Sequence, residues 1–357
     1  MKTKMKTLAV AAGLCAASAA MAQSSVQLYG IVDVSVRSGT GFTSGYARSP
    51  ANATSVASGV GPTSRWGVRG TEDLGGGLRA LFNLESGINV DTGMPANAAT
   101  YFDRASIVGL AGGWGTVTMG RQNTLLADSA GVADPIGLRF AGLNPNIQVT
   151  SLTGHLLGVE FGATGSSGSS NRVNNSVKYS VPVGPVMARA MYSFGEVAGS
   201  SSKLRSAGLG LDYLTPRLSL TSAVTQFRDA NDRELKAGNI GASWQALPAL
   251  RVMANAGYNR GETSATAVTR NRLLAVGVNY AVSPLVDVLA GYYKVDRSRT
   301  GQADDGFGRL LAFVEYKLSK RSKVYVELDT TKWKGDYGVA GGKSTSNGLS
   351  LGMTHVF

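Results

Sequence analysis

The chain has 357 residues and a formal net charge of +12, from 35 lysines and arginines against 23 aspartates and glutamates. Its one cysteine, Cys15, lies in a segment that we expect to be removed, which excludes a disulfide framework and thiolate metal sites. After residue 22 no run approaches the roughly 18 apolar residues of a transmembrane helix. Lysine and arginine form no compact block interleaved with aromatic residues, so no nucleic-acid partner is expected.

Residues 1–22 read as a secretory signal peptide. Three lysines at positions 2, 4 and 6 precede the apolar stretch Leu8–Ala20, and Ala20-Met21-Ala22 is an A-x-A cleavage site. We therefore expect the mature protein to begin at Gln23. No linker or change of composition divides residues 23–357, which predicts a single large domain.

Within that domain, alternating apolar and polar residues predict sixteen β-strands. Their predicted starts lie near residues 25, 63, 78, 101, 116, 172, 186, 204, 218, 235, 250, 271, 286, 308, 323 and 347. The breaks between them alternate in length, as expected for the two ends of a membrane barrel.

Short breaks are predicted at Glu72–Gly77, Gly112–Gly115, Pro182–Pro185, Thr215–Arg217, Ala246–Ala249, Ser283–Pro284 and Ser319–Ser322. Long breaks are predicted at Ser38–Pro62, Asn89–Thr100, Gly261–Arg270, Ser298–Phe307 and Lys334–Ser346.

The longest break runs from Asn123 to about Asn171. A structureless loop of this length inside a compact domain is usually functional or marks a wrong assignment. Leu156–Phe161 could form an extra short strand; otherwise the segment is long enough to fold back into a barrel.

The final stretch, Asn347–Phe357, alternates strictly with a period of two over about ten residues, the length that a tilted strand needs to cross a bilayer. Six strands carry an aromatic residue close to their end: Tyr179, Tyr213, Trp244, Tyr280, Tyr316 and Phe357. A soluble β-sandwich would show the same alternation but has little reason to place these aromatics. The pattern therefore predicts an all-β fold, a transmembrane β-barrel of sixteen antiparallel strands with an aromatic girdle.

Several segments resemble the trimeric general porins of Gram-negative bacteria, of the betaproteobacterial type. They are V-Q-L-Y-G-I-V-D at Val26–Asp33, S-R-W-G-V-R-G-T-E-D-L-G-G-G-L at Ser64–Leu78, V-G-L at Val108–Leu110, G-T-V at Gly115–Val117, G-R-Q at Gly120–Gln122 and N-S-V-K-Y at Asn175–Tyr179. The resemblance implies a homotrimer and a long third loop folded into the pore, with loop acids facing wall bases. It also implies that the terminal Phe357 closes the barrel and is read by the outer-membrane assembly machinery.

Strand parity places five arginines on the inner face of the first four strands: Arg37, Arg65, Arg69, Arg79 and Arg104. Arg121 stands at the entry to the long break, which carries the acids Asp128 and Asp134. Together these eight residues are the predicted constriction and selectivity site. Each arginine could instead pair with a neighbouring carboxylate, whereas the cluster as a whole favours a positive field that attracts anions.

Three functions remain open at this point. The first is a passive channel for small hydrophilic solutes, mainly anionic and neutral; the second is a substrate-specific channel; the third is an adhesin or structural barrel with a plugged lumen. No arrangement of catalytic residues, metal ligands or cofactor motifs is visible, so we expect neither an enzyme nor a cofactor. The expected location is the outer membrane, reached through the periplasm, with outer-membrane lipid and lipopolysaccharide as neighbours.

Overall fold

The computed structural model describes residues 25–146, 171–338 and 341–357. The predicted signal peptide and the optional strand at Leu156–Phe161 lie outside the described residues. Among the residues that the structure describes, no helix is long and apolar enough to cross a membrane.

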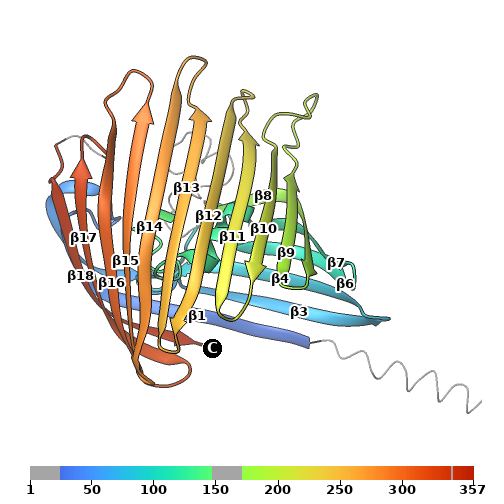
Figure 1. Cartoon of the computed structure of the whole chain (residues 1–357), viewed down its shortest axis with the longest axis horizontal. Coiled ribbons are helices and arrows are strands. Elements are labelled where there is room, and N and C mark those ends of the chain that lie inside the picture. Colours follow the sequence, from blue (N-terminus) through green and yellow to red (C-terminus); the bar gives the residue numbers. More distant parts are fainter. Residues whose placement is uncertain (1–24, 147–170, 339–340) are drawn as a thin grey trace, which may run out of the picture.

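Sixteen antiparallel strands close a β-barrel, as the sequence predicted (Figure 1). Closure comes from β1 (Ser25–Phe42), which pairs with β18 (Thr345–Val356) from Ile31↔Val356 to Thr40↔Asn347. The strands between them are β3 (Arg65–Gly75), β4 (Leu78–Asn89), β6 (Ala105–Gly112), β7 (Gly115–Asn123), β8 (Arg172–Val183), β9 (Val186–Ser193), β10 (Ser206–Leu214), β11 (Leu218–Arg228), β12 (Glu234–Leu247), β13 (Leu250–Glu262), β14 (Val268–Ser283), β15 (Val286–Arg299), β16 (Asp305–Lys317) and β17 (Ser322–Lys334).

Each observed barrel strand starts within about four residues of its predicted start. Tight turns join the strands at one end of the barrel, and longer hairpins extend from the other end (Figure 1). The alternation of short and long breaks is therefore confirmed.

The prediction of a long loop over Ser38–Pro62 was wrong. β1 continues to Phe42, and β2 (Arg48–Ser58) pairs back along it after a turn in which Thr43 N donates to Ala47 O at 2.9 Å. This stretch is rich in Ser, Thr, Gly and Ala, so its apolar alternation is weak although the backbone ladder continues.

The breaks at 261–270 and 298–307 are also shorter than predicted. The strands on either side continue beyond the apolar band, where apolar alternation no longer marks them.

β2 and β3 pair with the two halves of β1, and residues 59–64, which connect β2 to β3, enter the barrel interior. Val60 is fully buried there, and Gly61 N donates to Asp33 Oδ1 at 3.0 Å. A Cβ at Gly61 would clash with the Asp33 carboxylate, which favours glycine at this position of the connection.

The two faces of the wall differ as the alternation requires. Large apolar side chains are exposed on the outer face, among them Val36, Leu209, Ile240, Leu274 and Leu351. The inner face holds buried polar residues, including Ser35, Ser243, Asn255, Thr331 and Ser350. At the short-turn end, Trp114 stacks on Tyr179 with ring centroids 6.4 Å apart, which places part of the aromatic girdle.

Candidate functional site in the barrel interior

The described residues that follow β7, 124–146, are called the inner segment, and they pack against inward-facing side chains of the opposite wall. It begins with α2 (Leu125–Ala133), whose N-cap Thr124 Oγ1 accepts from Ala127 N at 3.2 Å. Three wall residues bond to its backbone: Thr221 donates to Ser129 O at 3.2 Å, Asn239 to Leu126 O at 2.8 Å and Asn255 to Ala133 O at 3.0 Å. The helix is therefore held against β11, β12 and β13.

Asp134, at the end of α2, organises the turn that follows. Its carboxylate accepts from Ile136 N, Leu138 N, Asn144 Nδ2, Asn146 Nδ2 and Tyr293 Oη, at 2.7–3.2 Å. Burial raises the pKa of Asp134, while the bonds from Asn146, Leu138, Asn144 and Ile136 act to lower that pKa. Asp134 is only 1% exposed, so it anchors the segment and does not face lumenal water.

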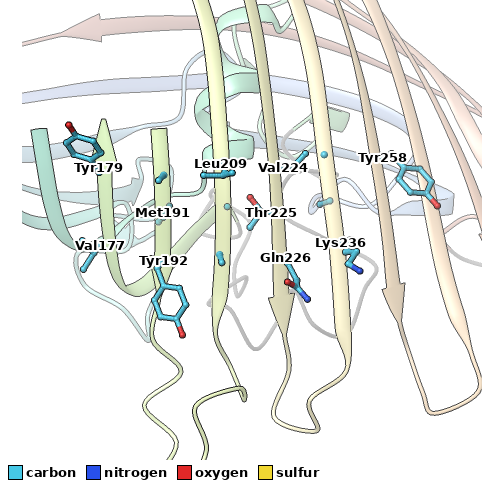
Figure 2. A pocket seen from close by; sticks show the side chains of 15 residues that line it. Val177, Tyr179, Met191, Tyr192, Leu209, Val224, Thr225, Gln226, Lys236 and Tyr258 are labelled. Atoms are coloured by element: carbon cyan, nitrogen blue, oxygen red, sulfur yellow. The ribbon is translucent and has the colours of Figure 1, made fainter. Parts of the chain in front are cut away.

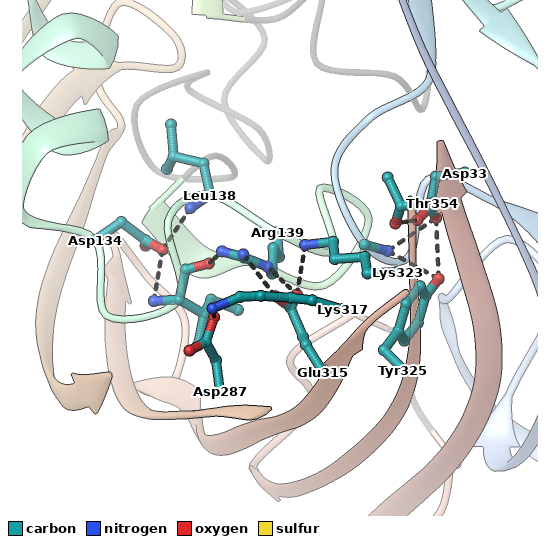
Figure 3. A network of polar contacts seen from close by, with 12 residues as sticks. Asp33, Asp134, Leu138, Arg139, Asp287, Glu315, Lys317, Lys323, Tyr325 and Thr354 are labelled. Carbon is teal, nitrogen blue, oxygen red and sulfur yellow. Dashed lines mark hydrogen bonds and ion pairs between the residues drawn. The ribbon is translucent and has the colours of Figure 1, made fainter. Parts of the chain in front are cut away.

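A polar network joins the end of this segment to the wall (Figure 3). Arg139 donates to both oxygens of Glu315 on β16, at 2.7 and 3.2 Å, and Lys323 donates to the same carboxylate at 2.8 Å. Nearby, Tyr325 Oη donates to Asp33 Oδ1 at 2.9 Å. The segment therefore contacts several strands on the side of the barrel that closes onto β1.

Arg37 is fully partnered. It is 3% exposed and binds Glu327 Oε2 at 3.0 Å and Asp329 Oδ2 at 2.6 Å, both on β17. Its guanidinium also lies 4.7 Å from the centroid of the Phe140 ring. Arg37 Nη1 also donates to Ser350 Oγ on β18 at 3.1 Å, so Arg37 joins β1 to the last two strands and to the inner segment.

Arg65 and Arg104 both contact the carboxylate of Glu85. Arg104 Nε lies 2.6 Å from Glu85 Oε1, and Arg65 Nε lies 3.7 Å from Glu85 Oε2. Tyr29 Oη donates to the same carboxylate at 2.9 Å. Two arginines share one carboxylate, so the cluster keeps an excess of positive charge, and Arg65 is 27% exposed.

Arg69 and Arg79 lie closer to the short-turn end of the same wall, and both are exposed. Arg69 donates to Gln27 Oε1 at 2.9 and 3.0 Å and lies over the Tyr29 ring at 4.6 Å. Arg79 lies opposite Asp73 in the β3–β4 ladder. These two residues are the most accessible of the predicted arginines.

Arg121 and Asp128 stand where the inner segment leaves the wall. Arg121 is buried and donates to Asp103 O at 2.7 Å and to Asn174 Oδ1 at 2.6 Å. Asp128 Oδ2 lies 2.7 Å from Lys178 Nζ and 3.6 Å from Arg189 Nη1. Its acidic charge is thus matched locally by two bases.

Sequence reasoning did not assign three lumenal acids: Glu315, Glu327 and Asp329 on β16 and β17. Glu327 and Asp329 alternate with the exposed Val326 and Leu328, so strand parity was sufficient to place them inside. Their pairing could not be read from parity. The pairs of Arg37 with Glu327 and Asp329 depend on closure of β1 against β18, and the pair of Arg139 with Glu315 depends on the path of the segment after β7.

A closed barrel of strands with an apolar outer face and a charged interior is the architecture of an outer-membrane channel protein. The family model described as Gram-negative porin matches residues 7–336, and the chain belongs to this family.

Curated relatives agree with that assignment. An outer membrane porin protein of Bordetella pertussis is 37% identical over 163 residues, covering 42% of this chain and 41% of the relative. Outer membrane porin protein 32 of Delftia acidovorans is 39% identical over 195 residues, covering 54% of this chain and 50% of the relative. The matched regions therefore span about half or less of the length of these curated relatives. Their names and the fold confirm the predicted outer-membrane location.

Solved structures of the same architecture cover nearly the whole chain. The anion-selective porin from Comamonas acidovorans superposes with a TM-score of 0.77 at 25% identity, covering 94% of this chain and 100% of that one. Salmonella typhi OmpF, solved as a complex with daunomycin, superposes with a TM-score of 0.65 at 13% identity and supports the fold alone.

Proposed function

We propose that the protein is a water-filled outer-membrane channel for passive diffusion of small hydrophilic solutes and ions, with a preference for anions. We propose no catalytic role and no cofactor for it. The observation that carries the anion preference is the unequal exposure of lumenal charges. Asp33, Asp134 and Glu327 are at most 1% exposed, whereas Arg65 is partly exposed and Arg69 and Arg79 are exposed. Of these three arginines, Arg79 lies opposite an exposed acid, Asp73.

The physical reason is that a solute samples mainly the charges that it can approach. Two unit charges about 4 Å apart interact by about 4 kcal/mol at an effective dielectric near 20, so a small excess of accessible cations biases entry. Salt screens this field, with a Debye length of about 10 Å at 0.1 M, so the preference should weaken as salt rises. The anion-selective porin from Comamonas acidovorans, which shares the barrel over its full length, supports the same direction.

We propose further that the segment after β7 narrows the pore and sets its constriction. Its bonds to Thr221, Asn239 and Asn255 on one side and to Glu315 on another support a path across the interior. The constriction is then formed between the inner segment and the wall that carries Arg65, Arg69 and Arg104, with Arg121 and Asp128 at its start.

The assembled form that we propose is a homotrimer. Residues 1–22 are proposed to be removed on export, leaving residues 23–357 as the mature porin domain. Phe357 is proposed to be read by the barrel assembly machinery, and outer-membrane lipid and lipopolysaccharide are proposed to surround the barrel.

A substrate-specific channel is less well supported, because an aromatic path along the lumen would be needed. Of the inward tyrosines, Tyr293 is bonded to Asp134 and Tyr325 to Asp33, and both are buried.

A plugged structural barrel would not conduct ions, so one experiment distinguishes it from an open channel. Purified protein added to a planar bilayer should produce stepwise increases of conductance; a protein that folds and inserts without conductance would support the plugged barrel.

A further inference from the structure

A polar cavity of about 270 Å³ lies beside the inner segment, near the long-hairpin end of β1. It is lined by the turn after β1, by β2, by the connection 59–64, by the end of β4 and by Ala141 and Gly142 of the inner segment. Grooves on the outer face of the barrel have a different character. The one in Figure 2, of about 860 Å³, is lined largely by apolar side chains such as Leu209 and Val224. The polar cavity is therefore the better candidate for binding a hydrophilic solute.

Two serines join the parts of the chain that line the cavity. Ser58 Oγ donates to Ser64 Oγ at 3.2 Å and accepts from Val90 N at 3.0 Å. Ser64 Oγ in turn accepts from Asp33 N at 3.0 Å. These bonds connect β1, β2, the connection 59–64 and the end of β4 without a bound molecule, so the cavity is already formed in the protein alone.

Tyr46 is fixed between the turn after β1 and the inner segment. Its φ of 66° lies in the left-handed region, which a bulky residue seldom adopts, and its N donates to Thr43 O at 3.0 Å. Its ring packs edge-on against Phe140, with centroids 5.0 Å apart, and a Cβ on Gly142 would clash with that ring. Burial raises the pKa of Tyr46 to about 12, so its hydroxyl keeps its proton at neutral pH and can donate a hydrogen bond.

Several polar side chains of the lining have no hydrogen-bond or ion-pair partner among the described residues. They are Ser44, Tyr46, Ser55, Thr63, Asn89 and Asp91. The hydroxyls and the amide can both donate and accept, whereas the carboxylate only accepts. Such a set of groups can bind a molecule whose own polar groups also donate and accept.

The charge of the lining limits the ligand further. Asp91 is the one charged side chain among the residues that line the cavity. An anion would be repelled by it. A cation would gain little from it, because Asp91 is exposed and a single solvated carboxylate binds an ion weakly. The lining therefore favours an uncharged ligand.

We infer that this cavity binds one ring of a neutral sugar, an uncharged solute with several adjacent hydroxyl groups. Each sugar hydroxyl both donates and accepts, as the free groups of the lining require. The volume lies just below the range of about 300–1,000 Å³ that suits drug-sized ligands, which leaves room for a single ring. The inference goes beyond the proposed function, because passive diffusion requires no bound solute.

The test measures binding of D-glucose to the purified full-length protein by saturation-transfer difference NMR, in a detergent without a sugar head group. The wild type should give a signal that saturates as glucose is added. Asn89→Leu should weaken binding about fivefold or more, because sugar hydroxyls lose their partner in the cavity. Ser55→Leu should weaken binding as well, since Ser55 lines the cavity and leucine would fill part of it.

Thr54→Leu is the matched control. Thr54 precedes Ser55 on β2 and shares the outer face with the exposed Val56, so the same substitution there adds its bulk outside the barrel. This variant should bind glucose like the wild type. Glucuronate, which carries a carboxylate on the same ring, should compete more weakly than unlabelled glucose because Asp91 repels it.

The inference would be overturned by a wild-type signal that does not saturate, by equal binding of the wild type and Asn89→Leu, or by glucuronate competing as strongly as glucose. The last result would place the binding on the arginines of the wall. Bilayer conductance is measured on the same preparations, which also shows that each variant is folded. Conducting protein without saturable glucose binding refutes this inference alone, and glucose binding without conductance refutes the proposed channel alone.

Discussion

Arg139 and Glu315 form a two-pronged ion pair, with nitrogen–oxygen distances of 2.7 and 3.2 Å, that joins the inner segment to strand β16. Their sequence positions are 176 residues apart, so the contact exists only when the barrel has closed around the segment.

Removing this pair should loosen the inner segment without unfolding the barrel. Each charge-assisted hydrogen bond contributes about 1.5–3 kcal/mol, and the wall keeps its own ladder of backbone bonds. Arg139→Ala should therefore raise current noise and change single-channel conductance, while the melting temperature of the barrel stays close to that of the wild type. Asp287→Asn is the matched control, because the Asp287–Lys317 pair does not involve the inner segment. Identical current traces for Arg139→Ala and the wild type would show that the pair does not hold the segment.

Arg37 should matter for folding more than for selectivity. Arg37→Ser leaves Glu327 and Asp329 buried without their cation, and breaking a buried ion pair in this way costs about 3–5 kcal/mol. We expect less folded barrel and a lower melting temperature, measured by heat-modifiable mobility on gels. The triple variant Arg37→Met, Glu327→Gln, Asp329→Asn should recover part of the loss, because it removes the unpaired charges. A fully stable Arg37→Ser protein would argue against this structural role.

Barrel closure should depend on the contact between Gly30 and Phe357. The two residues exchange backbone hydrogen bonds of 3.1 Å in each direction, and a Cβ on Gly30 would collide with the Phe357 ring. Gly30→Val and deletion of Phe357 should both slow assembly and leave unfolded protein in the periplasm. Gly113→Ala, where an added Cβ meets no atom within 4 Å, is the control. Normal amounts of folded protein in both closure variants would remove the basis for this prediction.

The arginines around Glu85 should set ion preference. Replacing Arg65 and Arg104 with Ser leaves Glu85 without its two cationic partners, so the reversal potential in a KCl gradient should move toward cation preference. Arg260 and Arg270 lie directly opposite each other on the outer face of β13 and β14, the face of the exposed Leu274. Arg260→Ser with Arg270→Ser therefore removes the same charge from the outer face and should leave the reversal potential unchanged. An equal shift in both double variants would mean that total charge, and not lumenal charge, decides selectivity.

The barrel could be predicted from the sequence for two reasons. A period-two pattern repeats from strand to strand, and an aromatic residue such as Tyr179 or Trp244 marks a strand end. The extension of β1 to Phe42 and the strand β2 were missed, since a ladder beyond the apolar band needs no apolar alternation. At the candidate site, parity alone placed Arg37 inside. Its neutralisation by Glu327 and Asp329 depends on residues about 290 positions away, which only closure brings together.

Asp134 illustrates the same limit. The sequence marked it as an acid of the long break and therefore as a candidate for the pore. In the structure it accepts hydrogen bonds from the turn that follows it and from Tyr293 across the barrel. Asp134→Asn would place an amide N–H₂ against these donors, so we expect disorder of the segment and not a simple gain in anion preference, which single-channel recordings would distinguish.

The central claim, an open channel whose accessible lumenal charge is basic, is tested most directly by the reversal potential of the wild-type protein. Purified protein is inserted into a planar bilayer, and the zero-current voltage is measured across a tenfold KCl gradient at low and at high total salt. We predict the sign of anion preference at low salt and a smaller magnitude at high salt, because screening shortens the reach of the arginine field. A zero-current voltage of the opposite sign, or a folded protein that does not conduct, would contradict the account.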